Sequence, residues 1–299
     1  MRPRWFPLLF VFSLAALAYA QDFSGVEIHT IPVRGSTYML EGVGGNIGLS
    51  IGKDGVLMID SQFAPLSEKI EAAIRNAGGG KVAFLVNTHW HGDHTGGNEF
   101  FGRTATIIAH TNVRKRLITD QNLPNRKVPA KPPEAWPLLT FEEGVTLHFN
   151  GEAIEVIHFP NGHTDGDSVV FFKGSNVVHL GDLFFSGRFP FIDLDSGGNV
   201  AGYIQNVATL LERIPEDALL IPGHGPLSTR KELATFHEML VETSRIVRER
   251  IESGASLEEI RKAGLPERWK GWGEGFVSTD RWIEILYQSF AHHSKSMER

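Results

Sequence analysis

The chain has 299 residues, a formal net charge of −6 and no cysteine. The lack of cysteine excludes disulfides and any thiolate metal ligand. Charges of both signs are present and no basic field results, which argues against nucleic acid as a partner. Residues 21–299 are long enough to form one large domain with an ample hydrophobic core.

The first twenty residues have the pattern of a secretory signal peptide. Arg2 and Arg4 form a basic start, residues 6–17 are largely apolar, and Ala18-Tyr19-Ala20 is a small-x-small cleavage site. An uncleaved membrane anchor is the alternative, but the apolar run is short for a membrane span. We therefore expect export to a periplasm or beyond, with no stable membrane insertion after cleavage.

Residues 26–60 alternate short apolar runs with glycine-rich turns, which predicts strands at 26–33, 37–40, 46–51 and 56–59. Asp60 follows the last of these strands. Its carboxylate either caps the next turn or orients metal-bound histidines from outside the metal's own ligand set. Residues 65–77 are predicted to be a helix that starts with Pro65 and stops at the glycines of 78–80.

A predicted buried strand at 82–86 leads into the segment T-H-W-H-G-D-H-T-G-G at 88–97. Side chains two residues apart point the same way in an extended segment, so His89 and His91 can share one metal. Asp93 and His94 then point towards a second metal. A merely polar loop is the alternative, but three of the chain's 13 histidines fall within the six positions 89–94. The segment therefore predicts a metal site.

The remaining chain supplies three more candidate ligands. A strand is expected within 100–109, a helical turn at 111–118, and an irregular loop at 119–140, where five prolines occur. That loop either flanks the cleft or is a plain connection. Strands are predicted at 145–149, 153–158, 168–172 and 176–180, and amphipathic helices at 200–213 and 229–252. His163 and Asp182 each follow one of these strands. His224 lies in the loop that ends a further buried strand, in the segment L-L-I-P-G-H-G-P between the two helices.

Seven candidate ligands thus lie in four segments, each at the end of a short apolar strand. Neighbouring strands place their end loops side by side, so these groups can converge. Imidazole and carboxylate ligands suit zinc first, with iron or manganese possible. Seven ligands suffice for two ions, and paired ions that share a hydroxide and a carboxylate are typical of hydrolases.

The order His-x-His-x-Asp-His, then G-H-T, G-D and G-H-G, resembles the metallo-β-lactamase superfamily. The resemblance implies an α/β (α+β) fold, the αββα sandwich of two mixed β-sheets flanked by helices. It assigns His89, His91 and His163 to a first zinc. It assigns Asp93, His94 and His224 to a second zinc, with Asp182 as the bridge. Asp93 and Asp182 would also be catalytic, and Asp60 would orient the ligands from the second shell.

The resemblance implies a hydrolase with two Zn²⁺ per chain that acts on a small-molecule substrate by attack of a metal-bridging hydroxide. Export favours the amide bond of a β-lactam and argues against glutathione thioesters. A lactonase or esterase of the same fold is the alternative, and a metal-dependent binding protein is the alternative outside enzymes. Asp182 stands where cysteine-bearing β-lactamases have a zinc ligand, which departs from their pattern.

Candidate substrate contacts follow Asp182. Arg188 can grip a carboxylate, and Phe185 and Asn199 are further candidates. The phenylalanines at 184, 185, 189 and 191 either line an apolar cleft or belong partly to the core. Phe185 occupies the position of a lysine in the cysteine-bearing enzymes. The aromatic residues Trp269, Trp272, Phe276 and Trp282 are expected to pack a terminal helix rather than to form a substrate cage.

Overall fold

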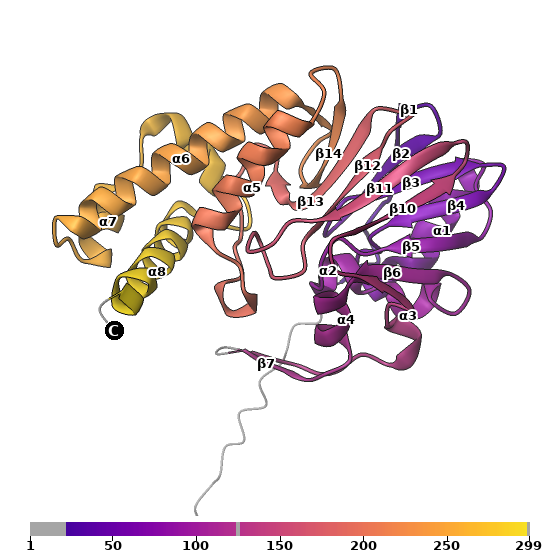
Figure 1. The fold of residues 1–299 in the computed structure, drawn as a ribbon, viewed down its shortest axis with the longest axis horizontal. Helices are drawn as coiled ribbons and strands as arrows, with labels where there is room; N and C mark the ends of the chain where they lie inside the picture. The colour runs from indigo at the N-terminus through magenta and orange to yellow at the C-terminus, as the bar shows by residue number, and fades with distance from the viewer. Residues whose placement is uncertain (1–21, 124–125, 298–299) are drawn as a thin grey trace, which may run out of the picture.

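The computed structural model describes residues 22–123 and 126–297, which form two β-sheets packed face to face with helices on both outer sides (Figure 1). The first sheet has the order β1-β2-β3-β4-β5-β6-β9 and the second has the order β10-β11-β12-β13-β14-β15. This is the αββα sandwich that the sequence predicts. The predicted signal peptide, residues 1–20, lies outside the described residues.

The first sheet is antiparallel from β1 to β4 and parallel from β4 through β5 and β6 to β9. The second sheet is antiparallel except for the parallel pair β13 and β14. The strands of the first sheet are β1 (His29–Arg34), β2 (Thr37–Glu41), β3 (Ile47–Gly52), β4 (Gly55–Ile59), β5 (Val82–Val86), β6 (Thr106–His110) and β9 (Leu139–Phe141). Those of the second are β10 (Gly144–Phe149), β11 (Glu152–His158), β12 (Ser168–Phe172), β13 (Val177–Phe185), β14 (Leu219–His224) and β15 (Ser228–Thr229).

Helices cover both outer faces of the sandwich (Figure 1). On the side of the first sheet are η1 (Ala64–Leu66), α1 (Ser67–Asn76) and α3 (Asn98–Phe101). On the side of the second sheet are α5 (Val200–Arg213), α6 (Arg230–Glu252), α7 (Leu257–Ala263), η4 (Glu267–Glu274) and α8 (Thr279–Met297). The remaining short helices are α2 (Gly92–Thr95), α4 (Thr111–Leu117), η2 (Pro133–Ala135) and η3 (Leu194–Ser196).

The alternation of side chains along each strand divides the interior into three apolar layers. In β4, Leu57 and Ile59 face the space between the sheets, while Val56 and Met58 face α1. In β12, Val170 and Phe172 face the same central space, and Phe171 faces α5 and α6. The central strands β4, β12 and β13 are therefore covered on both faces, which explains why they read as almost continuous apolar runs, whereas β1 and β10 are partly exposed.

Most predicted elements are present, and three differ in extent. The segment 119–140 contains a hairpin, β7 (Gln121–Leu123) and β8 (Arg126–Val128), then η2, and it ends in β9. β9 joins the edge of the first sheet, but three residues are too few for a periodic pattern. Residues 98–101 form α3, so the strand predicted within 100–109 is shorter. β13 continues through Asp182 to Phe185, and its register shifts around Gly181.

The tail forms α8, as expected, and its aromatic residues divide into two kinds. Trp269 and Trp282 are buried in the core beneath α6 and α8, whereas Phe276 is 89% exposed. Among the described residues, no helix combines the length and the hydropathy that a membrane span requires.

Candidate metal centre

The seven predicted ligands converge at one edge of the sandwich, although both sheets contribute to them. β5 ends at Val86, and the residues that follow it carry His89, His91, Asp93 and His94. The second sheet contributes His163 from the β11–β12 loop, Asp182 from β13 and His224 from the end of β14. The segment after β5 is joined to the second sheet by a backbone hydrogen bond, in which Ser168 N at the start of β12 donates to Thr88 O at 2.8 Å.

The first group of ligand atoms comes from His89, His91, His163 and Asp182, all of them buried, and these atoms lie within 4.8 Å of one another. His163 Nε2 is 2.8 Å from His91 Nδ1. Asp182 Oδ2 lies 3.3 Å from His163 Nε2 and 3.8 Å from His89 Nε2. Three imidazole nitrogens and one carboxylate oxygen thus surround a common centre, which matches the ligand number of zinc.

The second group comprises Asp93, His94 and His224, whose ligand atoms are equally close together. His94 Nε2 is 3.0 Å from Asp182 Oδ1, and His224 Nε2 is 3.4 Å from the same oxygen. Asp93 Oδ2 lies 3.4 Å from His224 Nε2. The two carboxylate oxygens of Asp182 therefore face different groups, Oδ2 the first and Oδ1 the second.

Four of the five histidines are held by a hydrogen bond on the ring nitrogen that faces away from the centre. Such outer partners fix ring orientation and tautomer in metal sites. The pairs are His89 Nδ1 with Thr88 Oγ1 at 3.0 Å, His91 Nε2 with Asp193 Oδ2 at 2.8 Å, His94 Nδ1 with Asp60 Oδ2 at 2.7 Å, and His163 Nδ1 with Phe191 O at 2.7 Å. For His224 the stacked ring of Phe185, 5.0 Å away, sets the orientation instead.

Asp60 connects two of these ring contacts. Its oxygens accept hydrogen bonds from Thr88 N at 2.8 Å, from Thr88 Oγ1 at 2.7 Å and from His94 Nδ1. Because Thr88 Oγ1 donates to Asp60, it accepts from His89 Nδ1. This leaves Nε2 of His89 free of a proton, and it turns Nε2 of His94 towards the centre, where a metal would replace its proton. Asp193 has the corresponding contact with His91, and no sequence pattern predicted it, because it lies in an irregular segment without a motif.

The charges in the centre are arranged to hold cations. Burial alone would raise the pKa of Asp182, but the surrounding imidazoles, His94 first, hold it well below its usual range. Burial would lower the pKa of His224, but Asp182 and Asp93 raise it to about 9. The pKa of His94 is likewise raised well above its ordinary value by Asp182, Asp93 and Asp60, against the effect of burial. Protons on these two rings occupy positions where a metal would bind, so metal binding releases them.

Two features of the packing fit a metal better than a polar core. His89 Nε2 is buried without a hydrogen bond, so its lone pair needs a partner other than a protein donor. Glycine stands where a side chain would enter the centre. A Cβ at Gly45 would lie 2.2 Å from His94 Cε1, and one at Gly223 would lie 2.1 Å from Asp182 Oδ1. The residues present therefore fit one or two zinc ions.

The three residues predicted to contact the substrate have different surroundings in the structure. Phe185 is 5% exposed and packs on His224, so its contact is with a ligand ring. Asn199 caps α5, where its side chain accepts a hydrogen bond from Gly202 N at 3.0 Å. Arg188 is half-buried, and among the described residues it has no ion pair or hydrogen bond through its side chain. Substrate contact by these three residues stays a prediction.

The phenylalanines after Asp182 split between core and centre. Phe184 and Phe189 are core residues that pack against Phe236 and Trp282. Phe191 is half-buried, and its ring lies 6.0 Å from the rings of both His91 and His163. Phe185 and Phe191 therefore border the centre, whereas Phe184 and Phe189 do not.

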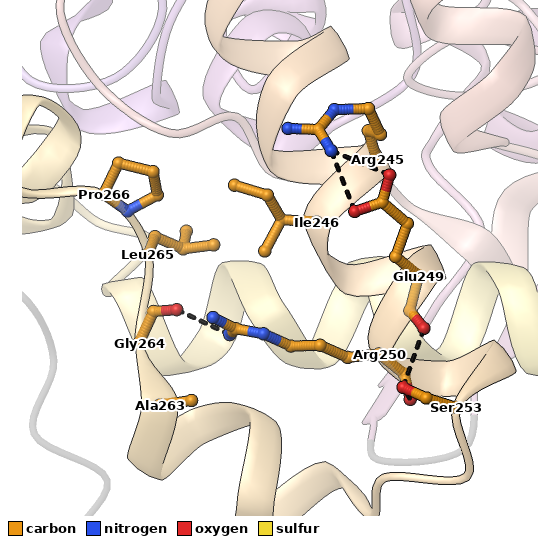
Figure 2. A pocket seen from close by; sticks show the side chains of 9 residues that line it. All are labelled: Arg245, Ile246, Glu249, Arg250, Ser253, Ala263, Gly264, Leu265 and Pro266. Carbon is orange, nitrogen blue, oxygen red and sulfur yellow. Dashed lines mark hydrogen bonds and ion pairs between the residues drawn. The ribbon is translucent and has the colours of Figure 1, made fainter.

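A surface pocket of about 540 Å³ lies elsewhere, between α6 and the chain that follows α7 (Figure 2). None of its lining residues belongs to the two ligand groups. Its cations are already paired, since Arg245 contacts Glu249 at 2.7 Å and Arg250 donates to Gly264 O at 2.7 Å. The first contact lies within α6, and the second joins α6 to the connection after α7, so both stabilise the local structure.

The fold and the two ligand groups define an αββα sandwich with a candidate metal centre. The sequence profile of the metallo-beta-lactamase superfamily matches residues 40–224, and the chain belongs to that superfamily. The matched segment runs from β2 to His224, so it includes all seven candidate ligands. Metal binding, typically of zinc, is a property that the superfamily and the two ligand groups support together.

The chain resembles relatives of several kinds. A protein of Aquifex aeolicus (strain VF5) is 30% identical over 164 residues, which are 53% of this chain and 74% of that protein. A metallo-beta-lactamase type 2 of Bacteroides fragilis is 22% identical, over 58% of this chain and 62% of its own length. A hydroxyacylglutathione hydrolase of Prochlorococcus marinus (strain MIT 9312) is 30% identical, over 48% of this chain. The chain spans about half the length of this last relative, which is 51% covered.

Solved structures confirm the fold alone, because their sequences are distant. The DIM-1 metallo-beta-lactamase superposes with a TM-score of 0.59 at 24% identity, and covers 73% of this chain and 99% of its own. The sec-alkylsulfatase Pisa1 from Pseudomonas sp. superposes with a TM-score of 0.67 at 14% identity, over 88% of this chain and 50% of its own.

Proposed function

We propose that this chain is an exported hydrolase with two zinc ions per chain. His89, His91 and His163 would hold the first ion, Asp93, His94 and His224 the second, and Asp182 both. The observation that carries this proposal is the division of the Asp182 oxygens between the two ligand groups. A carboxylate that is shared in this way is the arrangement of hydrolases with paired metals.

When bound, such a pair of ions supplies a water that ionises near neutral pH and a Lewis acid for the substrate oxygen. The chain itself supplies orientation and charge. Asp182 holds the two ligand groups together, and Asp60 and Asp193 fix ring orientation. Of the seven candidate ligands, Asp93 has the most exposed side chain, at 28%, so it can contact both water and substrate. Its carboxylate would help to hold the second ion and would orient the attacking water.

The first substrate class that we propose is the β-lactams, whose amide bond would be cleaved. Similarity to the metallo-beta-lactamases type 2 of Bacteroides fragilis and of Elizabethkingia meningoseptica supports this choice. Export would place the enzyme where such compounds arrive, and the pattern of residues 1–20 supports export. N-terminal sequencing of protein recovered from a bacterial periplasm tests export, which requires Gln21 or a close neighbour as the first residue.

A second candidate is the hydrolysis of esters, lactones or thioesters. The observation that favours it is the carboxylate of Asp182 at the position where cysteine-bearing β-lactamases have a thiolate. Similarity to hydroxyacylglutathione hydrolases and to an acyl-coenzyme A thioesterase of Gallus gallus also supports it. A chromogenic cephalosporin assayed beside a lactone and a thioester separates the two candidates. Full zinc loading without turnover of any of them would instead support a metal-dependent binding protein.

Arg188 provides a prediction that separates anionic from neutral substrates. Replacement of Arg188 by alanine is expected to raise KM for an anionic β-lactam by roughly 10- to 100-fold, because a charged hydrogen bond to a carboxylate contributes about 1.5–3 kcal/mol. KM for a neutral ester should change little. Steady-state kinetics with both substrates measures the difference, and an equal effect on the two would show that Arg188 does not bind the carboxylate.

A further inference from the structure

Phe276 has the most exposed large hydrophobic side chain among the described residues, at 89%. Burial of a phenylalanine side chain stabilises the folded state by about 1.5–3 kcal/mol, and the exposed side chain of Phe276 does not contribute this stabilisation. Single exposed apolar residues are common and need no explanation by themselves. What distinguishes Phe276 is its neighbourhood.

A line of rings connects Phe276 with the metal centre. The Phe276 ring lies 6.4 Å from the ring of Phe191, edge to face at 82°. The Phe191 ring in turn lies 6.0 Å from the rings of His91 and of His163, two ligands of the first group. The backbone oxygen of Phe191 also accepts the hydrogen bond from His163. An apolar surface therefore runs from the solvent to the ligands.

The chain around Phe276 is anchored on both sides. On one side, Trp272 O accepts a hydrogen bond from Phe189 N at 3.1 Å, and the Trp272 ring stacks on Phe236 at 6.2 Å. On the other side, Val277 is buried, and it leads into α8. The backbone that carries Phe276 is thus held by packed neighbours on both sides. Less conformational entropy is lost on binding when the backbone at a contact is already fixed.

Arg188 lies beside this apolar surface. A Cβ at Gly275 would meet Arg188 Cβ at 3.4 Å and its Cδ at 3.5 Å, so the arginine stem runs along the backbone next to Phe276. This segment lies outside residues 40–224, the part of the chain that the superfamily profile matches. Phe276 is therefore an addition to the part of the chain that defines the family, whereas Phe191 and Arg188 belong to that part.

We propose that Phe276 and Phe191 bind the apolar part of the substrate, an alkyl chain or an aromatic ring attached next to the bond that is cleaved. The substrate class is then an amphiphile with a hydrolysable group and an apolar group, and Arg188 is available for an anionic substituent. This inference rests on the proposed hydrolase function. It adds that Phe276 determines specificity through the apolar group.

Calorimetric binding of butanoate, hexanoate and octanoate to the zinc-loaded protein tests the proposal without turnover. Each is an acyl product analogue, and the three differ only in apolar length. The wild type is expected to bind up to roughly 15-fold more tightly for each step in length, because each step adds two methylenes and a fully buried methylene contributes about 0.8 kcal/mol. Phe276→Ala should lose most of this dependence, and Val241→Ala, which removes another exposed apolar side chain, should keep it.

The same length dependence in Phe276→Ala as in the wild type, or none in the wild type, would overturn the proposal. Turnover of matched esters on the same preparations tests the hydrolase separately. A length dependence of binding that Phe276→Ala removes, in a protein that turns over none of the esters, would reject the hydrolase function. It would still support the ligand contact. Turnover of the esters, with carboxylate binding that is independent of chain length, would support the hydrolase function and reject the ligand contact.

Discussion

Replacement of Asp182 by asparagine is expected to lower turnover by roughly 100-fold or more and to weaken the binding of zinc. The Asp182 carboxylate is the group that both ligand sets share, with Oδ1 3.0 Å from His94 Nε2 and Oδ2 3.3 Å from His163 Nε2. Asparagine keeps the shape but removes the negative charge and places an amide N–H₂ where one lone pair should face a cation. Zinc content by metal analysis and kcat for the best substrate measure the effect.

The metal-free form of this variant offers a second observation. Asp182 is the main group that raises the pKa of His224 to about 9 and the pKa of His94 well above its ordinary value, in both cases against burial. Without the carboxylate, both rings are expected to lose their protons at a lower pH, which NMR titration can follow. Asp167→Asn is a matched control, because Asp167 is also buried but belongs to neither ligand group. Unchanged zinc content and turnover in Asp182→Asn would remove Asp182 from the centre.

Gly223→Ala is expected to disrupt the centre although it changes no ligand. An added Cβ would lie 2.1 Å from Asp182 Oδ1 and 2.6 Å from Gly181 O, which is closer than van der Waals contact allows. Either the carboxylate turns away or β13 and β14 move apart, so zinc binding and turnover should fall by at least about tenfold. Overpacking of this kind also costs about 1–3 kcal/mol of stability. Zinc content and the midpoint of thermal unfolding are the measurements.

Gly92→Ala is the control for Gly223→Ala. Gly92 lies between two of the candidate ligands, but a Cβ there would meet no atom within 4 Å. If both alanine variants bind zinc as the wild type does, the close packing of Gly223 against Asp182 has no consequence for the centre. If only Gly223→Ala loses zinc, the effect is steric and local.

The seven candidate ligands could be predicted because each is marked by residues that lie next to it in the sequence. Three histidines and an aspartate within six positions are rare by chance, and His163, Asp182 and His224 each follow an apolar strand. The layers of the fold were implied by the resemblance to the superfamily, and the order of the predicted strands and helices along the chain agrees with them. The order of the strands within each sheet was not predicted, because no pattern of residues provides it.

The contacts that orient the ligands could not be predicted in the same way. Asp193 reaches His91 from an irregular segment, and the partner of His163 is a backbone oxygen, which carries no sequence signal. Asp182 was expected after a strand, but β13 continues through it because Gly181, at φ 50°, lets the strand shift its register there. The short strand β9 is formed by pairing with β6 rather than by its own periodicity.

Zinc counted per chain in the purified mature protein, together with hydrolysis of a chromogenic cephalosporin with and without a chelator, tests the central claim most directly. The geometry of the two ligand groups predicts two zinc ions and turnover that the chelator abolishes. Two zinc ions without cephalosporin turnover would support the metal centre but not the β-lactam substrate, and esters, lactones and thioesters would be assayed next. A protein that binds no zinc after loading, or one whose turnover survives the chelator, would contradict the account.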